Sequence, residues 1–311
     1  MKRLVSTVGL PKEDWLKIRR TGLTGTDIGA ITGMNPYSSA FQVYHDKLSE
    51  EIEDFDNEAM RQGRDLEEYV AKRFTEETGL KVRRANAVYQ NEDYPFMLAD
   101  FDRLIVGEEA GLECKTVSAY SADRWSDGKI PHHYQMQVQH YLAVSGYKAW
   151  YVAALIMGRE FVIRKIERDE ELIRNLIIIE KRFWEDHVLA RVAPDPDGSK
   201  AYSEMLLQLY HGDEKKEIQL FGMKEQLSRR AEIEQLVKKL ETEKEQIDQN
   251  IKLQMQDASY AVAEDYRISW VQANQNRIDA KRLKEEQPEI YNQYTKEVTS
   301  RRFNVKYSPA A

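Results

Sequence analysis

Two carboxylates and a lysine with the chemistry of a hydrolytic metal site lie close together near the middle of the chain. Glu113 and Lys115 flank Cys114 in a segment with strand character, and the strand period of two places both side chains on one side. Asp102 ends an earlier apolar, strand-like run, and a hairpin through residues 107–111 would bring it beside Glu113. Two hard oxygen ligands beside an ammonium group are typical of a Mg²⁺ or Mn²⁺ site that activates water. An exposed hairpin with ordinary surface charges is the alternative, because this spacing is a loose pattern.

The helix predicted over residues 57–78 adds a third acid. Glu67 lies within its apolar stripe, between Leu66 and Val70, and a carboxylate directed into a core is costly unless a cation or hydrogen-bond donors meet it. A metal ion would meet it, and a buried arginine is the alternative. Gln137 lies on a helical face with Tyr141, where it is either a core amide or a site residue.

The amino-terminal part offers a different feature. The segment Thr24-Gly25-Thr26-Asp27 is able to cap a helix, whose first N–H groups attract anions. Arg19 with Thr26 could therefore receive a terminal phosphate, although most threonine caps bind nothing. The glycines at positions 22, 25, 29 and 33 match neither the dinucleotide fingerprint nor a phosphate loop, which excludes a nucleotide-hydrolysing interpretation.

Composition limits the class of protein. The chain has 311 residues, 41% of them apolar, which is enough for about two domains with real cores. Its formal net charge of −7 provides no chain-wide positive field for a polyanion. The single Cys114 excludes a disulfide framework and a zinc site built on several cysteines. No apolar run reaches the roughly 20 residues of a spanning helix, and no signal-peptide core follows Met1, so we expect a soluble, intracellular protein.

The elements that must position these residues alternate between helix and strand signals, which indicates an α/β core. Before residue 193 we predict helices over 14–20, 26–31, 57–78 and 133–145, strands over 80–89, 96–106 and 111–117, and a hairpin of 149–157 with 161–166. Pro194, Pro196 and Gly198 mark a boundary. We therefore predict a first domain over residues 1–193 and a mostly helical extension over 194–311. The extension is predicted to contain a long amphipathic helix or helical hairpin over 213–259, strands over 266–271 and 302–307, and a helix over 288–298.

The order of the motifs resembles the phage lambda exonuclease and YqaJ-type viral recombinase nucleases of the PD-(D/E)XK superfamily. The resemblance covers roughly residues 13–190. It is carried by Trp15-x-x-x-Arg19, Thr24-Gly25-Thr26-Asp27, Gly63-Arg64-Asp65-Leu66-Glu67, Thr78-Gly79, Ala99-Asp100-Phe101-Asp102, Leu112-Glu113-Cys114-Lys115 and Gln137-Val138-Gln139. It implies an α/β (α+β) fold, a restriction-endonuclease-like core with a central mixed sheet flanked by helices.

The resemblance also implies roles at the centre of the site. Asp102 and Glu113 match the metal ligands, which the backbone carbonyl of Cys114 completes. Lys115 matches the catalytic lysine, and Glu67 matches the helix carboxylate, which holds metal directly or through water.

Three further positions follow from the same resemblance. Gln137 matches the active-site glutamine, Arg19 the arginine that binds the 5′-phosphate, and Thr26 a position where some members carry serine. Phe101 replaces the proline common before the metal aspartate. Asp100 therefore competes for the ligand role, but Asp102 keeps the register.

The implied activity is 5′→3′ degradation of one strand of linear double-stranded DNA, which exposes a 3′ single strand for recombination by strand annealing. Two Mg²⁺ ions, with Mn²⁺ as a substitute, are the implied cofactors. The implied partners are DNA ends, a phage single-strand annealing protein and further copies of the chain in a ring-shaped trimer. No membrane is implied as a partner. The implied location is the cytoplasm of a bacterial host cell, and the protein is expected to be encoded by a phage or prophage.

Two other functions use the same residues differently. A structure-specific or sequence-specific endonuclease would cleave a covalently closed circle, which an exonuclease leaves intact. A non-catalytic DNA-end-binding adaptor would show no metal-dependent cleavage.

Overall fold

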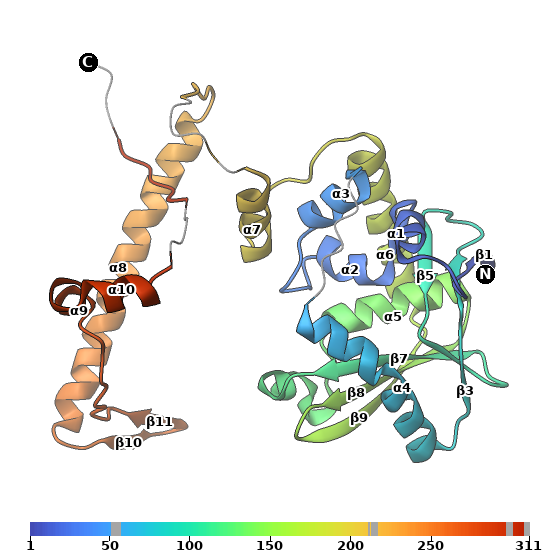
Figure 1. The fold of residues 1–311 in the computed structure, drawn as a ribbon, viewed down its shortest axis with the longest axis horizontal. Helices are drawn as coiled ribbons and strands as arrows, with labels where there is room; N and C mark the ends of the chain where they lie inside the picture. Colours follow the sequence, from blue (N-terminus) through green and yellow to red (C-terminus); the bar gives the residue numbers. More distant parts are fainter. Residues whose placement is uncertain (51–56, 211, 213–216, 297–300, 308–311) are drawn as a thin grey trace. The chain divides into compact units, whose positions relative to one another are not determined.

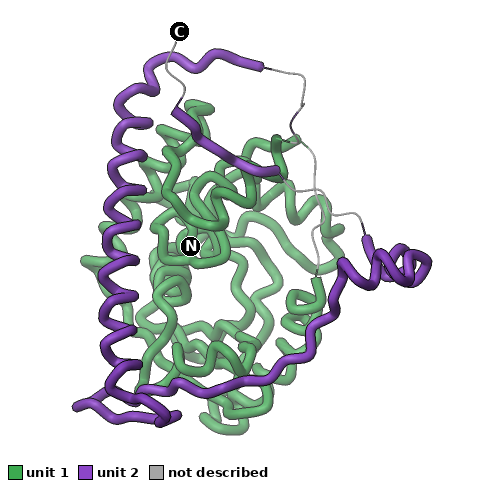
Figure 2. Tube along the Cα trace, turned by 90° about the vertical axis from the view of Figure 1, so that its left-hand side faces the viewer, with its two compact units in different colours: residues 1–210 green, residues 211–311 purple. Residues whose placement is uncertain are grey.

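The computed structural model describes residues 1–50, 57–210, 212, 217–296 and 301–307. It divides into two compact units, residues 1–210 and residues 211–311 (Figure 2). The first unit combines two sheets with helices, as the α/β prediction requires (Figure 1).

A mixed five-stranded sheet carries the central part of the first unit. Its strand order is β3 (Val82–Arg84), β6 (Arg103–Ile105), β7 (Ala110–Val117), β8 (Ala149–Ile156) and β9 (Glu160–Glu167). Only the pair β7 and β8 is parallel in this sheet of the described chain. Parallel neighbours need a crossover connection, which here contains η1 (Ala119–Gly128) and α5 (His132–Ser145).

A second, four-stranded sheet has the order β1 (Lys2–Ser6), β4 (Ala87–Gln90), β5 (Met97–Asp100) and β2 (Leu23–Thr24). Two predicted strands are divided between the sheets. The run 80–89 breaks at Asn86, which has a positive φ of 52°, and the run 96–106 breaks after Asp100. The prediction of single strands was wrong there, because period-two apolar patterns do not reveal a change of sheet.

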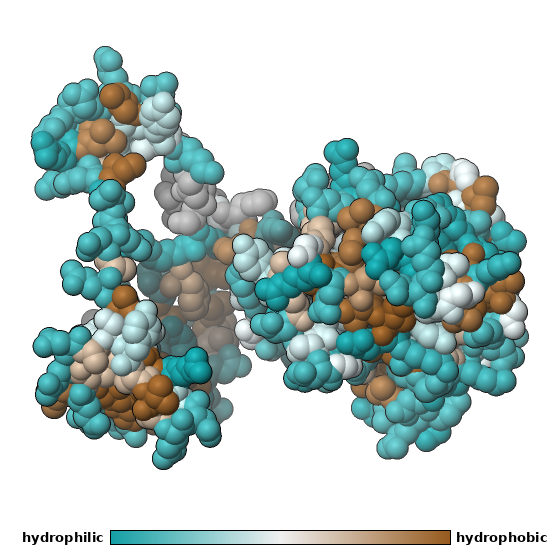
Figure 3. Space-filling view, turned by 90° about the horizontal axis from the view of Figure 1, so that it is seen from below, coloured by the Kyte–Doolittle hydropathy of each residue, from teal (hydrophilic) through white to brown (hydrophobic). Residues whose placement is uncertain are grey.

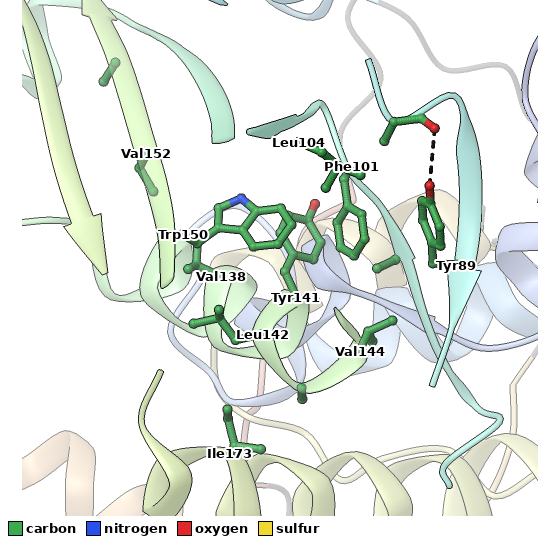
Figure 4. Packing of buried hydrophobic residues seen from close by; sticks show 14 of the residues in the cluster. Tyr89, Phe101, Leu104, Val138, Tyr141, Leu142, Val144, Trp150, Val152 and Ile173 are labelled. Atoms are coloured by element: carbon green, nitrogen blue, oxygen red, sulfur yellow. Dashed lines mark hydrogen bonds between the residues drawn. The ribbon is translucent and has the colours of Figure 1, made fainter. Parts of the chain in front are cut away.

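Phe101 explains the second break. Its ring turns into an aromatic cluster, with centroid distances of 5.2 Å to Tyr89, 5.1 Å to Tyr141 and 4.7 Å to Trp150 (Figure 4). Aromatic pairs at such distances stabilise beyond the area they bury. The Tyr89 hydroxyl donates to the Ala85 carbonyl, which fixes the edge of this cluster (Figure 4). The chain direction therefore changes immediately before Asp102.

The helices of the first unit are α1 (Lys12–Arg20), α2 (Gly25–Ile31), α3 (Ala40–Leu48), α4 (Glu58–Thr78), α5, α6 (Glu170–Arg182), the π-helical turn η2 (Phe183–Leu189) and α7 (Lys200–Leu209). The four predicted helices are confirmed as α1, α2, α4 and α5, whereas α3, α6, η2 and α7 were not predicted. Asn57 caps α4 by accepting from the Met60 N–H, and Gly79 ends it at a φ of 74°.

The first unit continues beyond the predicted boundary at residue 193. Tyr202 and Met205 of α7 are buried in a cluster with Phe41 of α3, and the rings of Phe41 and Tyr202 stack 4.5 Å apart. The Pro-rich segment is therefore a connection within this unit, because it returns the chain to an apolar surface.

The second unit contains α8 (Lys224–Met255), the hairpin β10 (Tyr260–Ala263) and β11 (Tyr266–Ser269), α9 (Ala280–Glu286) and α10 (Pro288–Tyr294). The amphipathic segment is a single helix, and its predicted start at 213–216 lies outside the described residues. The predicted helix 288–298 ends at Tyr294, and residues 297 and 298 also lie outside them. The strand prediction for 302–307 was wrong, because no strand of the described chain pairs with this segment.

Apolar side chains of the second unit remain at its surface. Met255 is the only buried residue among those described in this unit, and apolar residues gather on the outside (Figure 3). A hydrophobic core of its own is therefore missing from the described part of this unit. Across the described residues no helix is sufficiently long and apolar to cross a bilayer.

A fully buried pair, His140 and Glu180, joins α5 to α6. Both carboxylate oxygens of Glu180 lie 3.0 Å from His140 Nδ1, and the Leu98 carbonyl oxygen lies 2.8 Å from Nε2. An ionised carboxylate and a carbonyl only accept hydrogen bonds, so both ring nitrogens donate when the ring is charged. Burial opposes this charge, but Glu180 outweighs it and raises the pKa of His140.

We predict that the free energy of unfolding falls as pH rises through the raised pKa of His140. The folded state binds the proton more tightly than the unfolded chain. The stabilisation is therefore complete below the unfolded pKa of about 6.5 and is lost at higher pH. Urea denaturation between about pH 6 and pH 9 measures it. The decline should be absent in His140→Gln, and an identical decline in that variant would assign it to other groups.

Candidate active site

The β6–β7 pairing brings Asp102 and Glu113 together. Arg103 lies opposite Leu112 in the antiparallel register, so Asp102 is placed immediately before β6 and beside β7. Asp102 Oδ2 accepts a 2.8 Å hydrogen bond from the Cys114 N–H. The predicted hairpin is therefore present, and it fixes the Asp102 carboxylate against the backbone of β7.

Glu113 is buried among donors on one side only. Its Oε1 accepts from Lys115 Nζ at 2.6 Å and from Gln137 Nε2 at 2.7 Å, which shows that Glu113 and Lys115 share one side of β7 as predicted. Gln137 is buried and also contacts the Tyr141 hydroxyl at 2.8 Å. Glu113 Oε2 is buried without a hydrogen-bond partner in the described chain. An unpartnered buried carboxylate oxygen is costly unless a cation meets it.

The charges at this point are unbalanced. Burial, followed by the charges of Glu113 and Glu67, raises the pKa of Asp102 well above its usual range, and Lys115 only partly offsets this. Burial also raises the pKa of the Cys114 thiol, which leaves the backbone carbonyl as the candidate ligand at that residue. The donor set of carboxylate and carbonyl oxygens, with one oxygen unpartnered, fits a hard divalent cation.

Glu67 is held differently from the other two acids. Its Oε1 forms an ion pair with Nη1 of Arg103, a buried side chain that also binds Glu68 Oε2 at 3.0 Å and the Asp102 carbonyl at 2.8 Å. The alternative of a buried arginine is thus realised. Within the described ranges, no three His, Cys, Asp or Glu side chains are arranged to hold a metal ion. Glu67 is near enough to affect Asp102, but it does not form a ligand group with it in this arrangement.

Arg19 and Thr26 are brought together at the start of α2. Arg19 Nη2 donates to Thr24 Oγ1 at 3.0 Å and to Thr26 Oγ1 at 2.9 Å. The guanidinium of Arg19 lies 4.6 Å from the centre of the Trp15 ring, and the Trp15 indole N–H donates to Asp100 Oδ2 at 2.6 Å. Asp100 is therefore engaged by Trp15, which supports Asp102 as the ligand.

The Arg19–Thr26 pair lies near the acidic cluster because α2 packs tightly on α5. A Cβ atom at Gly25 would lie 2.5 Å from Tyr141 Cε1 and 3.0 Å from Gln137 Cγ, so only glycine fits. Gln137 in turn contacts Glu113. The first residues of α2 are thereby one side chain away from the carboxylates.

Sequence reasoning gave no separate role to three residues of this region. Arg103 neutralises Glu67, Thr24 shares Arg19 with Thr26, and Lys47 is a buried cation 2.7 Å from Asp27. Lys47 also donates to the Arg19 carbonyl at 3.0 Å. No spacing pattern identifies Lys47, since α3 was not predicted.

Comparisons with known proteins identify the family of the chain. Residues 14–148 match the model of the YqaJ-like viral recombinase domain. The chain is 40% identical over 302 residues to the uncharacterized protein YqaJ of Bacillus subtilis (strain 168), covering 96% of this chain and 95% of that protein.

Solved structures are similar at lower identity. LHK-Exo in complex with dAMP is 20% identical with a TM-score of 0.51, over 64% of this chain and 100% of that chain. A second structure of this alkaline exonuclease, from Laribacter hongkongensis, has a TM-score of 0.49 at 18% identity and the same coverage. The first likeness shows that the chain has the predicted PD-(D/E)XK-type fold.

We predict that Mg²⁺ stabilises the protein through Glu113. An ion that binds only the folded state adds about 2.7 kcal/mol to the free energy of unfolding at a concentration 100-fold above its Kd. Thermal denaturation with Mg²⁺ or with EDTA measures the gain. Glu113→Gln should abolish it, whereas Glu109→Gln, which removes an exposed acid paired with Lys148, should retain it. An equal gain in Glu113→Gln would place the ion elsewhere.

Proposed function

Because the chain belongs to the YqaJ-like viral recombinase family, we propose that it is a metal-dependent, phage-type DNA exonuclease. It degrades one strand of linear duplex DNA in the 5′→3′ direction and leaves a 3′ single strand for recombination by annealing. One observation supports this proposal: the hydrogen-bonded pair Arg19 and Thr26 lies at the start of α2, which packs on α5, and α5 carries Gln137 to the Asp102–Glu113–Lys115 cluster.

Asp102, Glu113 and the Cys114 carbonyl would hold Mg²⁺, or Mn²⁺ in its place, and two ions are expected. Glu67 would also hold a metal ion, directly or through water. It could leave its present partner Arg103, because Arg103 would remain paired with a second acid, Glu68. Bound there, the ions supply Lewis-acid stabilisation of charge on the scissile phosphate.

Lys115 acts as a cation in this mechanism. Burial opposes its charge, but Glu113 outweighs burial and raises the pKa of Lys115 above its usual value. A protonated amine orients the attacking water and stabilises negative charge on phosphate oxygens. Gln137 holds Glu113 Oε1 through its amide, so that Oε2 keeps a fixed direction.

Arg19 and Thr26 determine polarity in this proposal. A guanidinium is well suited to a phosphate because it offers several donors in a planar fork. Recognition of the terminal 5′-phosphate would place the adjacent phosphodiester at the carboxylates. Cleavage then proceeds from that end only.

The proposed partners are DNA ends, a phage single-strand annealing protein and further copies of the chain in a ring-shaped trimer, all in the cytoplasm of a bacterial host. The second unit is the proposed interaction region. Apolar residues of α8 such as Leu236, Leu240 and Ile247 are exposed, and exposed apolar groups of this kind mark interaction sites. An annealing protein bound there would receive the strand as it is exposed.

We predict that Lys115→Ala lowers kcat for duplex DNA by about 100-fold or more, the usual cost of removing one preorganised group that stabilises transition-state charge. DNA affinity should remain near the wild-type value, because one cation among many contacts contributes little to it. Single-turnover cleavage and fluorescence anisotropy measure the two quantities. Lys148→Ala is the matched control, since Lys148 is exposed and paired with Glu109. Undiminished cleavage by Lys115→Ala would remove the lysine from the mechanism.

We predict that Arg19→Ala erases the preference for 5′-phosphorylated over 5′-hydroxyl ends. Linear duplexes labelled at either end, with and without the phosphate, report polarity and preference in Mg²⁺. A retained preference would locate the phosphate pocket elsewhere. A covalently closed circle should remain intact, and its cleavage would favour the endonuclease alternative. Absence of cleavage of any duplex would favour the non-catalytic adaptor.

A further inference from the structure

A groove of about 560 Å³ lies in the first unit, between the segment after α2, the η1 region and the first turn of α5. Its polar lining is basic: Arg124, Lys129, His132 and His133 contribute to it, with Gln135 as an uncharged polar residue. No acidic side chain of the described chain lines it. In a protein with a net charge of −7, such a lining is a local exception.

The two exposed cations of the groove, Arg124 and Lys129, form no ion pairs within the described chain. Within the described ranges, neither Arg124 nor Lys129 forms a salt bridge or a side-chain hydrogen bond, and both are exposed. Most other lysines and arginines of the first unit contact an acid, as Lys148 contacts Glu109 and Lys165 contacts Glu167. Unpaired cations are available to an external anion.

The cations around the groove also act on His133, which lies in its lining. Burial, followed by the charges of Lys115, Arg124 and His132, lowers the pKa of His133 to about 4. His133 is therefore neutral at physiological pH, and the positive charge of the groove resides mainly on Arg124 and Lys129. Pro131 gives α5 no side-chain cap, so the helix dipole adds to this potential.

The groove lies next to the candidate active site, and the ring of Tyr134 lies between the two. Lys115 Nζ lies 4.7 Å from the centre of the Tyr134 ring, and the His133 ring lies 4.1 Å from the same ring. The path from the lysine to the groove thus crosses one aromatic side chain. A polyanion held in the groove would therefore reach Lys115 by passing the Tyr134 ring.

We propose that this groove binds the sugar-phosphate backbone of the DNA beyond the cleaved nucleotide, with Arg124 and Lys129 as its phosphate contacts. The proposal rests on the proposed function, because it assigns the groove to the same substrate. It makes Arg124 and Lys129 substrate-binding residues that position the duplex without contacting the scissile phosphate. Their contribution is independent of base sequence.

The test compares Arg124→Gln/Lys129→Gln with the charge-matched control Lys148→Gln/Lys165→Gln. Binding of a long duplex is measured at several salt concentrations with Mg²⁺, each pair being combined with Lys115→Ala so that nothing is cleaved. Each lost phosphate contact lowers the slope of log K against log[salt] by about one and weakens binding roughly tenfold at about 0.1 M salt. The groove pair should show both changes, and the control pair neither.

Turnover with Lys115 intact provides the second measurement. The groove pair should raise KM for the long duplex and leave kcat unchanged, which loss of folding would not produce. An unchanged salt slope and affinity in the groove pair would overturn the proposal. Failure of the proposed function is separate, since it would appear as absence of cleavage by the wild-type chain while duplex binding still depends on Arg124 and Lys129.

Discussion

The repulsion between Asp102 and Glu113 is the constraint on which the site depends. The β6–β7 register holds both carboxylates in a buried position, although burial and mutual proximity disfavour two negative charges. Cys114 N–H and Lys115 each satisfy one of them, and Glu113 Oε2 remains without a partner. The stability of the surrounding fold must offset this cost in the absence of a cation. The site is therefore organised for a bound positive charge, a property that a purely structural ion-pair network would not need.

Helix α5 transmits this constraint to the rest of the first unit. Within about one turn it directs Gln137 to Glu113, His140 to Glu180 and Tyr141 into the aromatic cluster with Trp150. Every residue of α5 from 137 to 145 is buried, so the helix has little freedom to shift. A close-packed interior of this kind is hardly compressible and leaves its side chains little room to move. Because α2 rests on the same helix at Gly25, its first turn is tied to the helix that contacts Glu113.

The sequence predicted the parts of the site that depend on local periodicity. The strand period placed Glu113 and Lys115 together, and the glycine-bounded turn predicted the hairpin that delivers Asp102. Contacts between distant segments could not be predicted in this way. Arg103 meets Glu67 only because α4 packs on the five-stranded sheet at β7 and β8, next to β6, and Trp15 meets Asp100 only because the run 96–106 changes sheets at Phe101. The boundary at residue 193 was misplaced for the same reason, since Tyr202 finds Phe41 through space.

The overall acidity and the proposed substrate are compatible because charge is arranged locally. A net charge of −7 repels DNA at long range, and the unneutralised carboxylates repel it at the site itself. Three cations that form no salt bridge within the described chain lie near this negative centre: Arg19 at the start of α2, and Arg124 with Lys129 in the groove next to Tyr134. In the proposed function, a strand would be attracted by these cations and repelled by the carboxylates until divalent ions reverse the charge at the carboxylates. Metal binding would then be a condition for productive engagement, because DNA held by the cations alone would not yet be in position for hydrolysis.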